Sequence, residues 1–87
     1  MNQAYLKEHV REELEGAKDY IMRAIEIKAM DPSWGKMLYN MSVEYFNKVS
    51  SAYKEPPKYL EDCMNEITEM YTECFATIKK MHEMYSK

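Results

Sequence analysis

The chain has 87 residues, a formal net charge of −3 at pH 7, two glycines and three prolines. A chain of this length makes one small domain. Gly and Pro, which interrupt helices, are few, and Val and Thr, which favour strands, are scarce, so the composition predicts a single helical domain over residues 1–87. The mild negative charge makes nucleic acid an unlikely partner, because nucleic-acid-binding domains usually carry a basic face. No apolar run approaches the ~18 residues of a membrane span. Residues Met1–Glu8 lack the basic segment followed by an apolar segment that is typical of a signal peptide. We therefore expect a cytoplasmic protein that does not associate with membranes.

The first predicted helix spans residues 3–29. Its apolar and aromatic residues recur at alternating steps of four and three, which is one stripe of an α-helix. Glu13 falls on this stripe, so we expect its carboxylate to face the core. The stripe consists of Leu6, Val10, Glu13, Ala17, Tyr20, Ala24 and Ile27.

The second predicted helix spans residues 32–53 and starts at Asp31-Pro32. Asp is a good N-cap and Pro suits the first helical position. The connection is so short that the first two helices must form an antiparallel hairpin. We expect the core stripe of this helix to be Trp34, Leu38, Met41, Tyr45, Lys48 and Ala52, and its solvated side to be Asn40, Glu44, Asn47 and Ser51.

The third predicted helix spans residues 57–85, after the break at Glu55-Pro56-Pro57. It has the most regular apolar seam of the chain. Cys74 belongs to the seam and Cys63 flanks it, and the two lie ~16 Å apart along the helix, too far to form a disulfide with each other. The sequence therefore predicts an all-α protein: a helical hairpin followed by a long C-terminal amphipathic helix. The seam consists of Leu60, Met64, Ile67, Tyr71, Cys74, Ile78, Met81 and Tyr85.

Two surface features admit more than one interpretation. Nine Met and eight Tyr either fill the core of a small bundle or supply a partner surface, and both can hold at once. Glu66, Glu69 and Glu73 form an acidic strip on one side of the third helix. This strip is either a solvated face or an electrostatic docking site for a basic partner.

Residues 10–53 resemble one half of a ferritin-like carboxylate bundle of the rubrerythrin type. In each half of such bundles one helix gives a Glu and the next gives Glu-x-x-His, all pointing inward. Glu13 followed by Tyr20 resembles the first ligand helix. Met37–Ser42 resembles the segment that precedes the second pair of ligands. Small proteins of this appearance are common in phages and prophages, and Lys80–Lys87 resembles their C-terminus.

This sequence departs from the family pattern at the second ligand pair, where Tyr45 and Lys48 stand at the Glu and His positions. Neither residue can serve as the lost ligand, because Lys is cationic and Tyr is neutral at neutral pH. The resemblance thus implies a vestigial metal site at Glu13, Tyr20, Tyr45 and Lys48, with no metal and no cofactor. We expect Lys48 to replace the metal's positive charge beside Glu13, Tyr45 to donate a hydrogen bond to Glu13, and Gly16 to allow a neighbouring helix to approach closely.

The functional expectation is a small non-enzymatic protein-binding module, of phage or prophage origin, that inhibits a host enzyme or a defence system such as CRISPR. Its partner would be a host or phage protein, its location the host cytoplasm, and its hairpin would self-associate into a homodimer. No Ser has a credible catalytic partner, and we do not expect His9 or His82 to bind metal. Two alternatives stay open: an oligomer that holds two metal ions through Glu13, Glu44 and a His, and a structural phage assembly factor.

Overall fold

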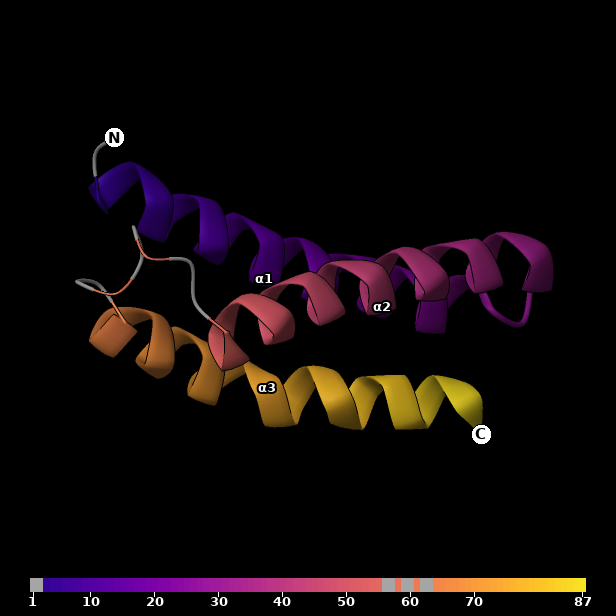
Figure 1. Cartoon of the computed structure of the whole chain (residues 1–87). Helices are drawn as coiled ribbons and strands as arrows, with labels where there is room; N and C mark the ends of the chain where they lie inside the picture. The colour runs from indigo at the N-terminus through magenta and orange to yellow at the C-terminus, as the bar shows by residue number, and fades with distance from the viewer. Residues whose placement is uncertain (1–2, 56–57, 59–60, 62–63) are drawn as a thin grey trace.

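The computed structural model describes residues 3–55, 58, 61 and 64–87, with the backbone alone for residues 3–7 and 52. The described residues form three helices, α1 (Gln3–Ile27), α2 (Pro32–Lys54) and α3 (Met64–Ser86), and no strand (Figure 1). The all-α prediction is confirmed. α1 ends two residues before the expected position and α2 one residue after it, while the expected start of the third helix at residue 57 lies outside the described residues.

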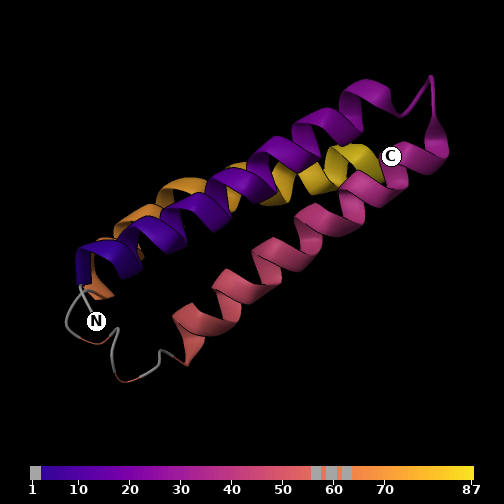
Figure 2. The same cartoon turned by 90° about the horizontal axis from the view of Figure 1, so that it is seen from above.

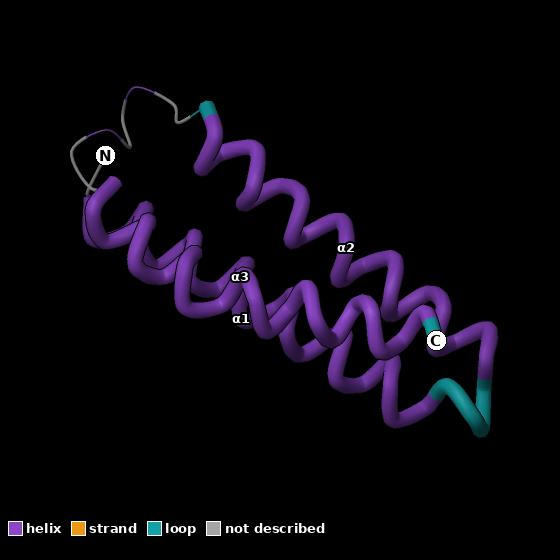
Figure 3. Tube along the Cα trace, turned by 90° about the horizontal axis from the view of Figure 1, so that it is seen from below, coloured by secondary structure: helices purple, strands orange, loops and turns teal. Residues whose placement is uncertain are grey.

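The helices run up, down and up, so α1 and α2 are antiparallel and α3 runs in the direction of α1 (Figures 1 and 2). The bundle is elongated, with extents of 44 × 21 × 16 Å. A short turn joins α1 to α2, and the C-terminus of α3 lies near this turn (Figure 3). None of the described helices is both long and apolar enough to cross a membrane.

The start of α2 shows the capping arrangement that the sequence predicts. The Asp31 carboxylate accepts a hydrogen bond from the Trp34 backbone N–H at 3.0 Å, and Pro32 occupies the first turn. The cap satisfies a backbone donor that has no partner within the helix. The start of α2 is therefore fixed by local chemistry at the turn.

We expect Asp31→Ala to lower the free energy of unfolding by about 1 kcal/mol, because this N-cap hydrogen bond is lost. Asp31→Ser is the matched control, since a serine hydroxyl accepts the same bond and should retain most of the stability. Urea denaturation of the three proteins measures the difference. Equal stability of wild type and Asp31→Ala would show that the cap contributes nothing.

The core has two clusters, one from the middle of the bundle to the end away from the α1–α2 turn, and one beside this turn. The α3 seam confirms its prediction for the described residues, since its buried positions are Ile67, Tyr71, Ile78 and Tyr85. Leu60 of that seam lies outside the described residues. The two clusters are centred on Val10, Leu14, Ala17, Phe46, Val49, Ile67, Tyr71 and Ile78, and on Ile21, Ala24, Leu38 and Tyr85.

The core face of α2 differs from the expected stripe. Ser42 is 0% exposed and Phe46 is 8% exposed, whereas Trp34 is 48% exposed and Lys48 lies in solvent. The cause is that α2 packs against two helices, so its buried face is centred between the sides that meet α1 and α3. The expectation that Lys48 points inward was therefore wrong, while the expected polar side (Asn40, Glu44, Asn47 and Ser51) is exposed as predicted.

The close approach of α1 and α2 occurs at Gly35, not at Gly16. A Cβ on Gly35 would lie 3.3 Å from the Lys28 Cα and 3.4 Å from the Ala24 carbonyl oxygen. A Cβ on Gly16 would lie 3.8 Å from the Tyr45 ring, which is an ordinary contact. The expectation for Gly16 was wrong, because the helices are more widely separated at its level.

The two glycines should respond oppositely to substitution. Gly16→Ala is expected to raise the free energy of unfolding by about 0.5–1 kcal/mol, because Gly in a helix costs that much and the added methyl fits. Gly35→Leu is expected to lower it by about 1–3 kcal/mol through overpacking against the α1 backbone. Thermal and urea unfolding of both variants test the pair, and a stabilising Gly35→Leu would contradict this packing.

Candidate protein-binding groove

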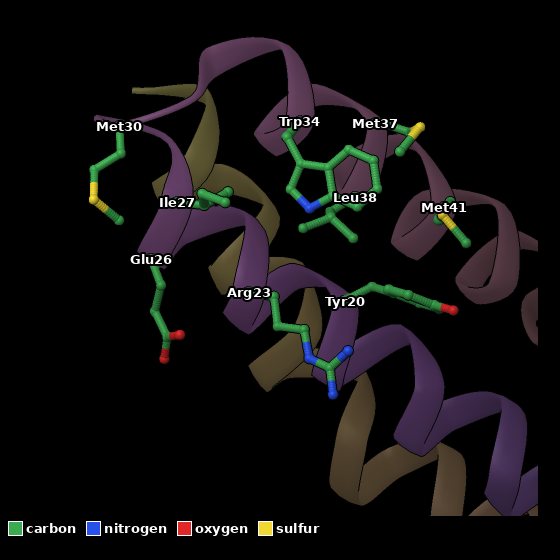
Figure 4. Close-up of a pocket in the computed structure, with 9 residues that line it drawn as sticks. All are labelled: Tyr20, Arg23, Glu26, Ile27, Met30, Trp34, Met37, Leu38 and Met41. Carbon is green, nitrogen blue, oxygen red and sulfur yellow. The ribbon is translucent and has the colours of Figure 1, made fainter.

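An apolar groove follows the side of the α1–α2 hairpin that α3 does not cover. Its larger part has a volume of about 620 Å³ and lies beside the turn (Figure 4). We call it the hairpin groove. Its lining residues come from α1, α2 and the turn between them: Tyr20, Arg23, Glu26, Ile27, Met30, Trp34, Met37, Leu38 and Met41.

Helical spacing explains how the walls of the groove arise. On α1, Tyr20 and Ile27 are two turns apart and share one face, while Arg23 and Glu26 stand further out on the same side. On α2 the buried Leu38 belongs to the floor. In Figure 4 Ile27, Trp34 and Leu38 lie between the two helices, and Arg23 and Glu26 extend away from the space between them.

The groove exposes apolar surface that a small soluble domain normally buries. Met30 is 81% exposed, Trp34 48% and Met37 41%. Contiguous apolar surface with a polar rim is typical of a protein-binding site, and Trp and Met are enriched at such sites. The groove therefore has the composition of an interface, not of a solvated helix face.

Sequence reasoning missed this site, although a signal for it was present. Met30 and Trp34 flank Asp31-Pro32, a turn where polar residues are usual. The spacing of the apolar residues puts Trp34 on the core stripe, but spacing alone does not separate a buried face from an exposed one. Apolar side chains on both sides of a capped turn indicate an apolar surface at the tip of the hairpin.

A second, smaller part of the groove contains three of the four predicted vestigial metal-site residues. It has a volume of about 320 Å³, and Glu13, Tyr20 and Tyr45 line it together with His9, Glu12 and Gly16. Tyr20 lines both parts, so they adjoin at this side chain. The rings of Tyr20 and Tyr45 stack with centroids 5.6 Å apart and an interplanar angle of 16°.

The expected contacts around Glu13 are not formed. Among the described residues, Glu13 makes no ion pair with Lys48 and no hydrogen bond with Tyr45; its carboxylate lies 3.5 Å from His9 Nε2 instead. The Lys48 Nζ lies 5.8 Å from the centroid of the Tyr45 ring, a cation–π arrangement at the surface. The assumption of an inward-facing Lys48 produced this error. Whether these positions descend from a metal site stays a prediction.

Ser42 and His82 form a buried polar contact that a sequence pattern does not reveal. The Ser42 hydroxyl donates to the Ala17 carbonyl oxygen at 2.5 Å, and His82 Nε2 lies 2.8 Å from the same hydroxyl oxygen. Because Ser42 has one proton, we infer that His82 Nε2–H is the donor of the second bond. His82 therefore does not act as a base toward Ser42, and the fully buried hydroxyl joins three helices instead of attacking a substrate.

Burial lowers the pKa of His82 below its ordinary value of 6.5. The His82 ring packs edge-on against the rings of Tyr39 and Phe46, with ring centroids 5.6 Å apart in each pair. These rings displace water from the imidazole, which disfavours its charged form.

We expect the stability of the protein to fall as the pH drops below 6.5. Below pH 6.5 His82 becomes protonated in the unfolded chain but stays neutral in the folded chain, so protonation favours unfolding. The free energy of unfolding therefore falls until the pH reaches the lowered pKa of His82 in the folded state, and this contribution does not change at still lower pH. His82→Asn removes this titration and leaves the other histidine of the chain in place. Urea unfolding between pH 5 and pH 8 should give a steeper pH dependence for wild type, and equal slopes would contradict the assignment.

The acidic strip is exposed as the sequence predicts, with Glu66, Glu69 and Glu73 all at the surface of α3. Cys74, beside the strip, is partly buried and has a free thiol. No cluster of three or more His, Cys, Asp or Glu suited to a metal ion occurs among the described residues. The strip and the hairpin groove are thus two distinct surfaces on different helices.

Comparisons of the chain with protein-family models, with curated proteins and with solved structures gave no match. The ferritin-like resemblance and the phage origin therefore stay predictions. The fold and the groove define the class on their own: a small three-helix bundle with an open apolar groove on its hairpin.

Proposed function

We propose that this chain is a non-enzymatic protein-binding module that uses the hairpin groove as its main interface. The exposure of Met30, Trp34 and Met37 around a groove of about 620 Å³ carries this proposal. Leaving this much apolar surface in water is unfavourable, and a protein that covers it gains the corresponding hydrophobic free energy.

We further propose that the module is a phage or prophage accessory protein that inhibits a host enzyme or defence system, with CRISPR machinery among the candidate targets. The resemblance of residues 10–53 and the small acidic chain support this specialisation. The acidic strip would serve as a second contact for a basic patch on the target, because complementary charge speeds association and favours the correct partner.

Affinity capture from a lysate of the host cell tests the function. The tagged wild type is compared with Met30→Lys and Trp34→Lys in the groove, with Glu69→Gln/Glu73→Gln in the strip, and with the control Met84→Lys. Met84 is an exposed methionine on α3 that does not line the groove. A protein retained in stoichiometric amount by wild type and control, and lost from a groove variant or from the strip variant, is the expected result. No such protein, or equal retention by every variant, would refute the proposal.

Metal analysis separates this function from the metalloprotein alternative. The purified protein and Glu13→Gln are measured by elemental analysis after growth with iron, manganese and zinc. We expect no stoichiometric metal in either protein. A metal bound to wild type and lost from Glu13→Gln would replace the binding-module proposal with a metal site.

A further inference from the structure

The rim of the hairpin groove carries one positive and one negative charge that have no partner within the described part of the chain. Arg23 and Glu26 both line the groove on α1, and neither makes an ion pair there. In Figure 4 the two side chains extend from the same edge of the groove into solvent. On α2, the opposite edge carries the uncharged Met37 and Met41. This pattern favours a partner that places a negatively charged side chain opposite Arg23 and a positively charged side chain opposite Glu26.

We infer that the occupant of the groove is a second copy of this chain, packed face to face about a two-fold axis perpendicular to the helices. This inference rests on the proposed function, since it names the protein that covers the groove. Such an axis reverses the helix direction, so α1 lies antiparallel to α1 of the second copy. If the axis passes midway between Arg23 and Glu26, each Arg23 faces the Glu26 of the other copy.

The same axis also matches the apolar residues of the groove. On α1 it places Tyr20 opposite position 29 of the second copy, next to Met30, which lies in the turn after α1. The contacts of Gly16 with Tyr45 and of Gly35 with Lys28 fix the relative level of the two helices, and by interpolation the axis crosses α2 near residue 38.

On α2, an axis at residue 38 places Trp34 opposite position 42 of the second copy, next to Met41, and Met37 opposite position 39, next to Leu38. In the register that pairs Arg23 with Glu26, the apolar residues of the two copies thus come within one residue of one another. A face that complements itself at both helices is what an isologous dimer requires.

The resulting dimer has a four-helix core made of two hairpins, with each α3 on the outside. The acidic strips on the two copies of α3 would stay exposed. The dimer would therefore present two acidic surfaces to a target while it hides the apolar grooves.

Sedimentation velocity from about 1 μM to about 1 mM, the range of moderate to weak affinity, tests the dimer. Wild type and Met84→Lys should dimerise, and Met30→Lys and Trp34→Lys should stay monomeric. Circular dichroism of each variant checks that the helices are retained. A wild type that stays monomeric throughout, or a dimer that the groove variants leave unchanged, overturns the inference.

The charge register has its own test, which does not depend on removing apolar side chains. R23E and E26R each place like charges across the axis, so each alone should dimerise about tenfold more weakly than wild type. Mixed in equal amounts, they should form a heterodimer with both ion pairs restored. A mixture that dimerises no better than its components overturns the register.

These outcomes separate the inference from the proposed function. If wild type is monomeric but a different protein is lost from the groove variants in the capture experiment, the dimer is wrong and the binding function stands. If no protein of any kind depends on the groove, both are wrong.

Discussion

Replacing Phe46 by alanine is expected to lower the free energy of unfolding by about 3–5 kcal/mol, the usual cost of removing a buried aromatic side chain. Phe46 is 8% exposed, and its ring lies 5.2 Å from that of Phe75 and 6.4 Å from that of Tyr71, centroid to centroid. It also contacts the His82 ring. A domain of this size has on the order of 5–10 kcal/mol of total stability, so the loss approaches the whole.

Lys48→Ala is the matched control, because the sequence pattern had placed Lys48 inward. Its side chain lies in solvent, and we expect a change within about 0.5 kcal/mol. Urea unfolding measures both variants. If Phe46→Ala does not fold, Phe46→Leu keeps the comparison measurable, with a smaller loss. A larger effect at Lys48 than at Phe46 would mean that the face of α2 has been assigned wrongly.

Replacing Trp34 by alanine is expected to weaken binding of the protein that covers the groove by about 30-fold or more. Truncated tryptophans at interface centres commonly cost about 2 kcal/mol or more, and each 1.4 kcal/mol is a factor of ten. The backbone N–H that bonds Asp31 is unchanged, so the helix cap is kept, but loss of the half-buried ring also lowers the free energy of unfolding of the monomer. Binding is therefore measured under conditions in which circular dichroism shows that Trp34→Ala is folded.

The dissociation constant of the complex, measured for wild type and Trp34→Ala by sedimentation or calorimetry, tests this expectation. Met84→Ala serves as the control for loss of an exposed apolar side chain outside the groove. A Trp34→Ala variant that binds as tightly as wild type would remove the groove from the interface.

The helices, the Asp31 cap and the α3 seam could be predicted from the sequence because local chemistry and periodicity determine them. The seam of α3 is regular because that helix packs against the hairpin with one face. Each of its buried residues, such as Ile67 and Ile78, is a hydrophobic residue at helical spacing. Composition and spacing alone were sufficient there.

The face of α2 could not be predicted in the same way, because two of its most buried positions carry no hydrophobic signal. Gly35 is buried where α1 approaches closely, and Ser42 is buried through its bonds to Ala17 and His82. A pattern based on apolar residues passes over both. The stripe was then drawn through Trp34 and Lys48, which are exposed.

The groove could not be predicted because it depends on which face of the hairpin α3 covers. Tyr20 and Tyr45 were expected at a common site and do stack, but they form a surface groove and not a buried centre. Helical spacing gives the two faces of a hairpin and does not say which one the third helix occupies. The packing of α3 settles that choice in the structure.

Oxidative footprinting tests most directly whether protein covers the groove. Hydroxyl radicals oxidise exposed Met and Trp side chains, and the chain carries its own references in Met22 and Met84, which are exposed outside the groove. The expected result is that Met30, Trp34 and Met37 are protected in concentrated protein or in the cell relative to dilute purified protein, while Met22 and Met84 are oxidised equally in both. Equal oxidation of all five residues under both conditions would contradict the account, because the groove would then be open to water.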